Sequence, residues 1–227
     1  MPIYIISLGG SLIVPNGTID VTYLKQFEHF IRRRLKEGDR FVIVTGGGGV
    51  TREYQKAARA LTALTRDDLD WLGIHVTRLN AHLLRTIFRD VARPVLCKDP
   101  TRITHFKKYP MVIGAGWKPG WSTDYVAVRI AKRLKAGMVV NLSNIDYVYD
   151  KDPRKFKSAK KIEEIDWPSF REIVGSEWDP GLNAPFDPVA SRLAHHANIP
   201  VMILNGKDLE NVGRALDGES FRGTRIK

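Results

Sequence analysis

Four short apolar runs in this chain each end in a turn of glycine or small polar residues. The first three turns precede stretches with helical periodicity, a pattern typical of a buried strand followed by a turn and a helix. Such a turn presents unpaired backbone N–H groups beside the positive end of a helix, which suits phosphate. The repetition predicts a nucleotide or phosphate site at the carboxyl ends of parallel strands. The four segments are 5–11 (IISLGGS), 41–49 (FVIVTGGGG), 111–116 (MVIGAG) and 138–144 (MVVNLSN).

Strands and helices alternate along the whole chain, as judged from hydrophobic periodicity and from the positions of glycine and proline. Strands are expected at 3–8, 40–45, 94–97, 110–114, 138–142, 200–204 and 223–226. Helices are expected from a cap at Asp20 to Gly38, and at 50–63, 67–92, 123–136, 167–174, 188–197 and 208–216. The alternation predicts an α/β fold, a three-layer αβα sandwich with a central, mostly parallel sheet. No repeat or low-complexity linker divides the chain, so 1–227 is expected to form a single domain.

The composition is ordinary for a soluble globular protein. The chain has 227 residues, 43% apolar and 27% charged, and it can bury a large core. No apolar run approaches the ~20 residues that span a bilayer, and the amino terminus lacks a signal-peptide layout, so no membrane partner is expected. The single cysteine, Cys97, excludes an intramolecular disulfide and favours a reducing cytoplasm. Cys97 itself is expected to be a small, buried hydrophobic residue.

The net charge of +11 favours a polyanionic partner, either nucleic acid or a nucleoside phosphate. Basic residues cluster at 32–34, at 102–108 and above all at 151–161, which holds six Lys or Arg. No RNA-binding aromatic motif, zinc-finger spacing or helix-turn-helix pattern accompanies them, so no nucleic-acid partner is expected. The segment 151–161 is equally compatible with neutralising a triphosphate and with being a plain surface loop.

The glycine turns do not match the short nucleotide-binding signatures. The pattern G-x-G-x-x-G with its acidic partner is absent, and no glycine is followed by Lys and then Ser or Thr, as a P-loop requires. Four consecutive glycines at 46–49 nevertheless carry a large conformational-entropy cost if they only turn the chain, which favours a ligand-binding role. Arg52 lies one turn into the following helix, where it either reaches an anion held by the turn or is a surface arginine.

The turn after the third run is the richest in chemical groups. Ser122 or Thr123 can cap the helix that follows, and both hydroxyls can bind phosphate oxygens. Simple helix capping is the alternative role for Thr123 and Asp124. Lys118 adds a point charge, and the two tryptophans of this loop can form walls for a base or a sugar.

A carboxylate follows the fourth run almost directly. Asp146 can organise cationic groups or magnesium near a transferring phosphate, and Tyr149 with Asp152 can shape an adenine pocket. Two adjacent histidines, His195 and His196, lack partners at metal-ligand spacing and are expected to lie on a helix surface or in packing. No metal site built by the protein is therefore predicted.

In their order along the chain and in their residues, these loops resemble those of the amino acid kinase superfamily and, within it, of the UMP kinases, most closely the archaeal type. The resemblance covers essentially the whole chain, and the motifs together are far more specific than any one alone. They are 45–48 (TGGG) with Arg52, 70–73 (DWLG) with 77–80 (TRLN), Pro119-Gly120 with 122–124 (STD), 143–146 (SNID) with Tyr149 and 152–153, and 186–190 (FDPVA) with 199–201 (IPV).

The resemblance implies transfer of the γ-phosphoryl group of Mg-ATP to UMP, giving UDP without a covalent intermediate. Asp146 would organise the catalytic centre, with Mg²⁺ held mainly by ATP, and Asp70 would bind the UMP ribose. The family further suggests an acceptor side at about 1–136, an ATP side at about 137–227, and a homo-oligomer, a hexamer built from dimers. The implied ATP-binding residues are Gly9, Gly10, Ser11, Gly48, Arg52, Ser143, Asn144, Tyr149 and Asp152. The implied UMP-binding residues are Gly47, Asp70, Trp117, Pro119, Gly120, Trp121, Ser122 and Thr123.

Four departures from the family's pattern bear on this function. Ser7 stands where many members have a lysine, and Pro185 stands where bacterial relatives often have one. Tyr147 replaces a usual glycine, and the phosphate loop is one residue longer and carries Lys118, a candidate catalytic residue that could supply the missing charge. Two alternatives therefore stay open: another small-molecule kinase of the superfamily, and a non-catalytic nucleotide- or oxyanion-binding protein.

Overall fold

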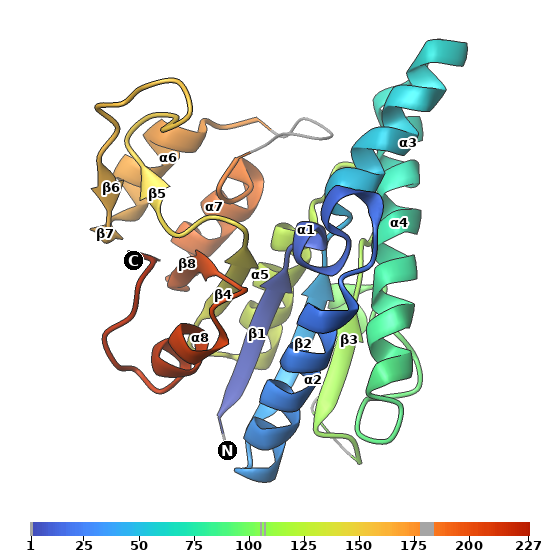
Figure 1. Cartoon of the computed structure of the whole chain (residues 1–227), viewed down its shortest axis with the longest axis vertical. Helices are drawn as coiled ribbons and strands as arrows, with labels where there is room; N and C mark the ends of the chain where they lie inside the picture. The colour runs from blue at the N-terminus through green and yellow to red at the C-terminus, as the bar shows by residue number, and fades with distance from the viewer. Residues whose placement is uncertain (1, 105, 107, 178–183) are drawn as a thin grey trace.

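The computed structural model describes residues 2–104, 106, 108–177 and 184–227. Its centre is a seven-stranded sheet in the order β3-β2-β1-β4-β8-β9-β7, and β5 and β6 form a separate two-stranded sheet (Figure 1). Neighbouring strands of the large sheet are parallel except β8 and β9. The predicted α/β fold with a mostly parallel central sheet is confirmed. The strands are β1 (Ile3–Leu8), β2 (Arg40–Thr45), β3 (Met111–Gly114), β4 (Val139–Ser143), β5 (Val148–Tyr149), β6 (Lys161–Ile162), β7 (Glu164–Ile165), β8 (Val201–Asn205) and β9 (Thr224–Ile226).

Helices cover both faces of the sheet and complete the three predicted layers. Strand residues alternate between the two cores: Ile6 packs with α2, α4 and α8, whereas Ile5 packs with α5, α6 and α7. Within the described residues, none of the helices has both the length and the apolar character needed to cross a bilayer. The helices are α1 (Gly10–Ile13), α2 (Val21–Lys36), α3 (Gly48–Leu61), α4 (Arg66–Ile87), α5 (Thr123–Leu134), α6 (Trp167–Val174), α7 (Pro188–His196) and α8 (Leu209–Leu216), with 3-10 turns at Pro15–Gly17 and Pro100–Arg102.

Side-chain caps fix where the helices begin. The carboxylate of Asp20 accepts a hydrogen bond from the Tyr23 amide at 2.9 Å, which confirms the predicted cap of α2. The Ser122 hydroxyl accepts from the Tyr125 amide at 3.0 Å and caps α5, so Thr123 is the first residue of the helix. Asp124 is not needed as a cap, and its side chain is free for another role.

The segment predicted as a strand at 94–97 is not a strand. Two isolated bridges replace it, Ala92 with Met111 and Cys97 with Gly114. Pro94 lies between them and has no backbone N–H to donate to a ladder, which explains the interruption. Cys97 is buried as predicted, and burial raises the pKa of its thiol to about 11.

The glycine turns after β1 and β2 touch each other through their backbones. A Cβ atom on Gly10 would lie 2.4 Å from the carbonyl carbon of Gly47 and 2.5 Å from the nitrogen of Gly48. Gly48 also has a φ of +64°, a left-handed conformation that side chains with a Cβ rarely adopt. The contact therefore requires glycine on both sides, and it sets the starts of α1 and α3 next to each other.

We expect Gly10→Ala to lower the free energy of unfolding by about 3 kcal/mol, because the new methyl group meets backbone atoms that cannot rotate away. Gly137→Ala is the matched control, since a Cβ there meets nothing within 4 Å and should change stability by less than about 1 kcal/mol. Urea denaturation followed by circular dichroism measures both. Equal stability of the two variants would contradict the backbone contact.

Candidate active site

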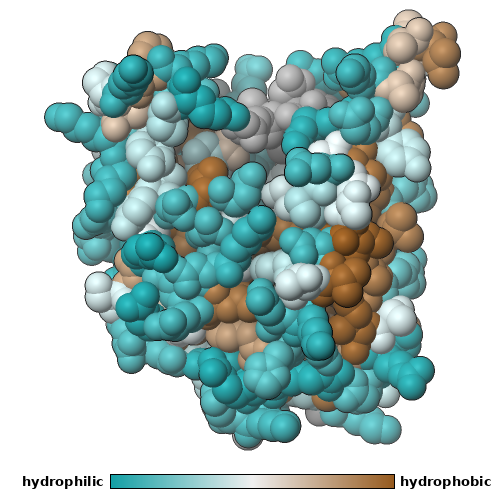
Figure 2. Space-filling view, viewed as in Figure 1, coloured by the Kyte–Doolittle hydropathy of each residue, from teal (hydrophilic) through white to brown (hydrophobic). Residues whose placement is uncertain are grey.

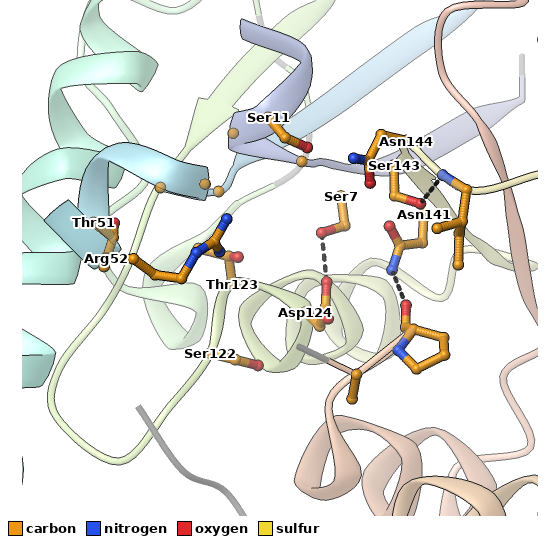
Figure 3. Close-up of a pocket in the computed structure, with 18 of the residues that line it drawn as sticks. Ser7, Ser11, Thr51, Arg52, Ser122, Thr123, Asp124, Asn141, Ser143 and Asn144 are labelled. Atoms are coloured by element: carbon orange, nitrogen blue, oxygen red, sulfur yellow. Dashed lines mark hydrogen bonds between the residues drawn. The ribbon is translucent and has the colours of Figure 1, made fainter. Parts of the chain in front are cut away.

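A cavity of about 1130 Å³ opens at the carboxyl ends of the central strands (Figure 3). The turns after β1, β2 and β4 line it, and the first turns of α3 and α5 face it. It brings together most of the residues that the sequence singled out. The predicted residues that line it are Gly9, Gly10, Ser11, Gly47, Gly48, Arg52, Asp70, Trp121, Ser122, Thr123, Ser143, Asn144, Tyr149 and Asp152.

The middle of the cavity is suited to phosphate. The glycine turns lie at the start of α3, where the first backbone N–H groups of a helix have no partner within the helix. Arg52 leaves the first turns of α3, and its guanidinium points into the cavity toward Thr123 of α5 (Figure 3). Backbone amides, a guanidinium and a second helix start thus face one volume, an arrangement that attracts anions.

One wall of the cavity is a loop tied to α4. The Asp70 carboxylate accepts a hydrogen bond from the Gly120 amide at 2.6 Å. The Arg78 guanidinium donates to the carbonyl of Gly116 at 3.3 Å and to that of Trp117 at 2.9 Å. These bonds hold the loop against the helix. Asp70 takes part in them and also lines the cavity.

The two tryptophans of this loop differ in whether they line the cavity. Trp121 lines the cavity and stacks on Tyr125, with 4.1 Å between ring centres. Trp117 also stacks on Trp121, with 6.2 Å between ring centres, and is not among the cavity-lining residues. Lys118 is exposed and places its Nζ 4.6 Å from the centre of the Trp117 ring. Like Trp117 and Lys118, the predicted residues Pro119 and Gly120 do not line the cavity.

The opposite wall follows β4 and carries mixed charges. Asp152 is paired with Arg154 at 3.1 Å, and this hydrogen bond lowers the pKa of the Asp152 carboxyl. Lys151 and Arg154, from the basic segment 151–161, also line the cavity. Asp146, the predicted organiser of the catalytic centre, is exposed outside the cavity lining and accepts a hydrogen bond from Asn205 at 2.9 Å.

The floor of the cavity holds Asp124, a motif residue for which the sequence suggested helix capping and no catalytic role. The Ser7 hydroxyl donates to Asp124 Oδ1 at 2.7 Å (Figure 3). The backbone amide of Asp187 donates to Asp124 Oδ2 at 3.2 Å. Nearby, the Asn141 side chain donates to the Pro185 carbonyl at 3.3 Å. One signal in the sequence pointed to Asp124. Ser122 precedes it and is sufficient to cap the helix, so the Asp124 carboxylate is not needed for capping.

The pKa values of Asp124 and of its neighbour Asp187, which does not line the cavity, are both raised. Burial raises the pKa of Asp124, against a smaller lowering by the Ser7 hydrogen bond. Burial, and after it the charge of Asp124, raise the pKa of Asp187 to about 7. Asp187 is 4% exposed and caps α7 through the Ala190 amide. None of the ion pairs formed among the described residues includes either carboxylate.

Fold and cavity together define an α/β protein with a cavity suited to phosphate-bearing ligands at the carboxyl ends of its strands. The chain belongs to the amino acid kinase family, whose model matches residues 2–205. The resemblance expected from the sequence motifs is thereby confirmed.

The relatives of this chain that match over its full length include archaeal uridylate kinases. One from Thermococcus sibiricus is 32% identical and covers 98% of both chains. One from Methanospirillum hungatei is 33% identical, over 100% of this chain and 95% of its own. The crystal structure of uridylate kinase from Archaeoglobus fulgidus aligns with a TM-score of 0.81 at 31% identity, with full coverage of both chains.

We expect Asp187 to make stability depend on pH. Its folded pKa of about 7 lies above the unfolded value of about 3.9, so the native state binds a proton that the unfolded state releases between these values. The free energy of unfolding therefore falls as pH rises from about 4 to about 7. Asp187→Asn keeps the cap and removes the charge, so its Tm advantage over the wild type should grow across this range in metal-free buffer.

Asp166→Asn is the matched control for this prediction. Asp166 caps α6 in the same way, but its hydrogen bonds to Ser169 lower its pKa, so losing its charge should have the opposite sign. A constant Tm difference between Asp187→Asn and the wild type from pH 5 to pH 8 would contradict the raised pKa.

Proposed function

We propose that this protein is a UMP kinase, which transfers the γ-phosphoryl group of Mg-ATP to UMP and releases ADP and UDP. The observation that carries the proposal is one cavity in which a glycine-lined phosphate cradle lies between two different walls. One wall, with Asp70 and Trp121, suits an acceptor nucleotide, and the other, after β4, suits a donor. The full-length similarity to proteins named uridylate kinase supports the same assignment.

The donor is placed on the β4 side of the cradle, in the C-terminal part from about 137. Gly9, Gly10 and Gly48 would hold the ATP phosphates, with Ser11 and Arg52 beside them. Ser143, Asn144, Tyr149 and Asp152 would line the rest of the nucleotide site. Mg²⁺ enters as part of the nucleotide substrate, and it lowers the charge of the phosphates. Lys151 and Arg154 add positive charge at the mouth of this side.

The acceptor is placed on the α4 side, within about 1–136. Gly47 and Asp70 would hold UMP, with Asp70 on the ribose, and the loop from Trp117 to Thr123 would wrap its phosphate. Asp70 already accepts a hydrogen bond from Gly120. Ribose binding therefore either shares this carboxylate with the loop or displaces the loop from it.

Catalysis in this site consists of positioning and charge stabilisation. An oxygen of the UMP phosphate attacks the γ-phosphorus, and the bond from this phosphorus to the β–γ bridging oxygen breaks, leaving ADP. Asp124 lies on the floor between both walls, hydrogen-bonded to Ser7 and to the amide of Asp187, and we assign it the role of organising the centre. Asp146 and Lys118 remain predicted contributors, although neither lines the cavity.

We also propose that the chain works in the cytoplasm as a homo-oligomer. The lone buried cysteine suits a reducing compartment. Figure 2 shows apolar side chains on the side of the molecule formed by α3 and α4, and Leu61 and Leu79 there are 88% and 71% exposed. Exposed apolar area of this kind marks an interaction surface, and light scattering of the purified protein measures the assembly.

The kinase proposal is tested by ADP release from Mg-ATP with UMP, CMP, dTMP, AMP or no acceptor. We expect turnover that depends on UMP and exceeds the blank. Turnover with another small acceptor alone would point to a different kinase of the family. Tight ATP binding with no turnover on any acceptor would instead support a non-catalytic nucleotide-binding protein. The departures from the family pattern at Ser7, Tyr147 and Pro185 motivate this alternative.

Two asparagine variants separate the candidate organisers of the centre. Asp124→Asn removes a charge from the cavity floor, and we expect turnover to fall by ~10²–10³ while UMP affinity stays within a few fold. Asp146→Asn removes a charge from an exposed residue outside the cavity lining and is expected to have the smaller effect. If Asp146→Asn loses more turnover than Asp124→Asn, Asp146 organises the centre, as the motif predicted.

A further inference from the structure

One turn of α4, at residues 77–80, is hydrogen-bonded to two segments that lie far from it and from each other in the sequence. The first is the end of β2 and the glycine turn that follows it. The side-chain amide of Asn80 donates to the carbonyl of Gly46 at 2.9 Å, and the Thr45 hydroxyl donates to the carbonyl of Thr77 at 2.9 Å. Asn80 and Thr77 are both buried, so water does not compete for these bonds.

The same turn of α4 also holds the loop after β3, residues 115–122. The Thr77 hydroxyl accepts a hydrogen bond from the Gly116 amide at 2.9 Å and donates one to the Ile74 carbonyl at 2.7 Å. The Arg78 guanidinium donates to the carbonyls of Gly116 and Trp117, as described above. A Cβ atom on Gly116 would lie 2.8 Å from Thr77 Oγ1, so the loop approaches the helix as closely as only glycine allows.

These bonds fix backbone atoms of the two segments and so fix their relative position. A buried carbonyl or amide that loses its partner costs more free energy than the bond itself contributes, which keeps the arrangement in one state. Neither Arg78 nor Asn80 lines the cavity, whereas Gly46 and Gly116 do. Both side chains therefore act on a ligand only through the backbone that they hold.

In the proposed reaction, these two segments carry the two reacting phosphates. The glycine turn after β2 would hold donor phosphates, and the loop after β3 would wrap the acceptor phosphate. Their separation matters for the rate, because a misplacement of about 1 Å can slow a reaction by about 10²-fold. The turn of α4 at 77–80 is thus placed to set the distance across which the phosphoryl group moves.

We propose that Arg78 is a positioning residue for the acceptor, holding the loop after β3 so that the acceptor phosphate faces the glycine turn. The effect on transfer rests on the proposed function, whereas the hold on the loop does not. Arginine suits this task because its planar fork of N–H donors can reach two successive carbonyls at once. The Arg78 guanidinium also lies 5.9 Å from the centre of the Trp71 ring, which restricts its movement.

The first test is amide hydrogen exchange of nucleotide-free protein, followed by mass spectrometry. We expect Arg78→Met to speed exchange in the loop 115–122 by about tenfold, with exchange in β1 and β2 unchanged. Arg85→Met is the matched control and should exchange as the wild type does. Arg85 lies two turns further along the same side of α4, and its Nε atom has no hydrogen-bond partner among the described residues. Equal exchange in the loop of Arg78→Met and of the wild type would overturn the hold on the loop.

The second test measures kcat and KM for UMP and for ATP by ADP release. Arg78→Met should raise KM for UMP and lower kcat by about tenfold each, with KM for ATP within about twofold of the wild type. Arg78→Lys keeps the charge without the planar fork and should fall between the two. A purely structural defect would reduce the amount of active enzyme and leave both KM values unchanged.

Circular dichroism checks that each variant is folded, and Arg78→Lys carries both comparisons if Arg78→Met is not. Unchanged kcat and unchanged KM for UMP in a folded Arg78 variant would overturn the positioning role and leave the kinase proposal standing. Absence of UMP-dependent turnover in the wild type would overturn the kinase proposal and, with it, the role of Arg78 in transfer. Hydrogen exchange would still decide whether Arg78 holds the loop.

Discussion

The contact between the glycine turns after β1 and β2 is the constraint on which the rest of the site depends. Gly10 lies against the backbone of Gly47 and Gly48, with no room for a Cβ atom. Because the two turns touch, β1 and β2 deliver the starts of α1 and α3 to the same place at the carboxyl edge of the sheet. Every ligand group that the cavity can hold is positioned relative to this cradle.

Two walls with different chemistry rise from the cradle. On the α4 side, Asp70 and Arg78 tie the loop after β3 to the helix, and Trp121 closes the wall by stacking on Tyr125. On the other side, the segment after β4 presents polar and basic groups. In the proposed reaction, the acceptor and donor nucleotides would meet over the cradle from opposite sides, as a direct transfer between them requires.

The floor beneath the cradle differs from its walls in its balance of charge. Asp124 lies there with Asp187 behind it, outside the cavity lining, and their raised pKa values express the cost of burying negative charge. A site that transfers phosphate increases this cost, so whatever compensates the floor also affects catalysis.

The sequence by itself determined the layers of the fold and most of the cavity, because both follow from local signals. Alternating apolar runs and caps such as Asp20 specify strands and helices over a few residues, and glycine turns at strand ends must gather at one edge of a parallel sheet. Only the tertiary structure decided that Asp124, rather than Asp146, lies on the cavity floor, and that its neighbours are Ser7 and Asp187. Those contacts join residues more than 60 positions apart, and side-chain direction across elements is set by packing, which no local pattern records. The strand predicted around Pro94 was wrong for a local reason: apolar composition suggested pairing, but Pro94 has no backbone N–H to donate to a ladder, and only two isolated bridges form.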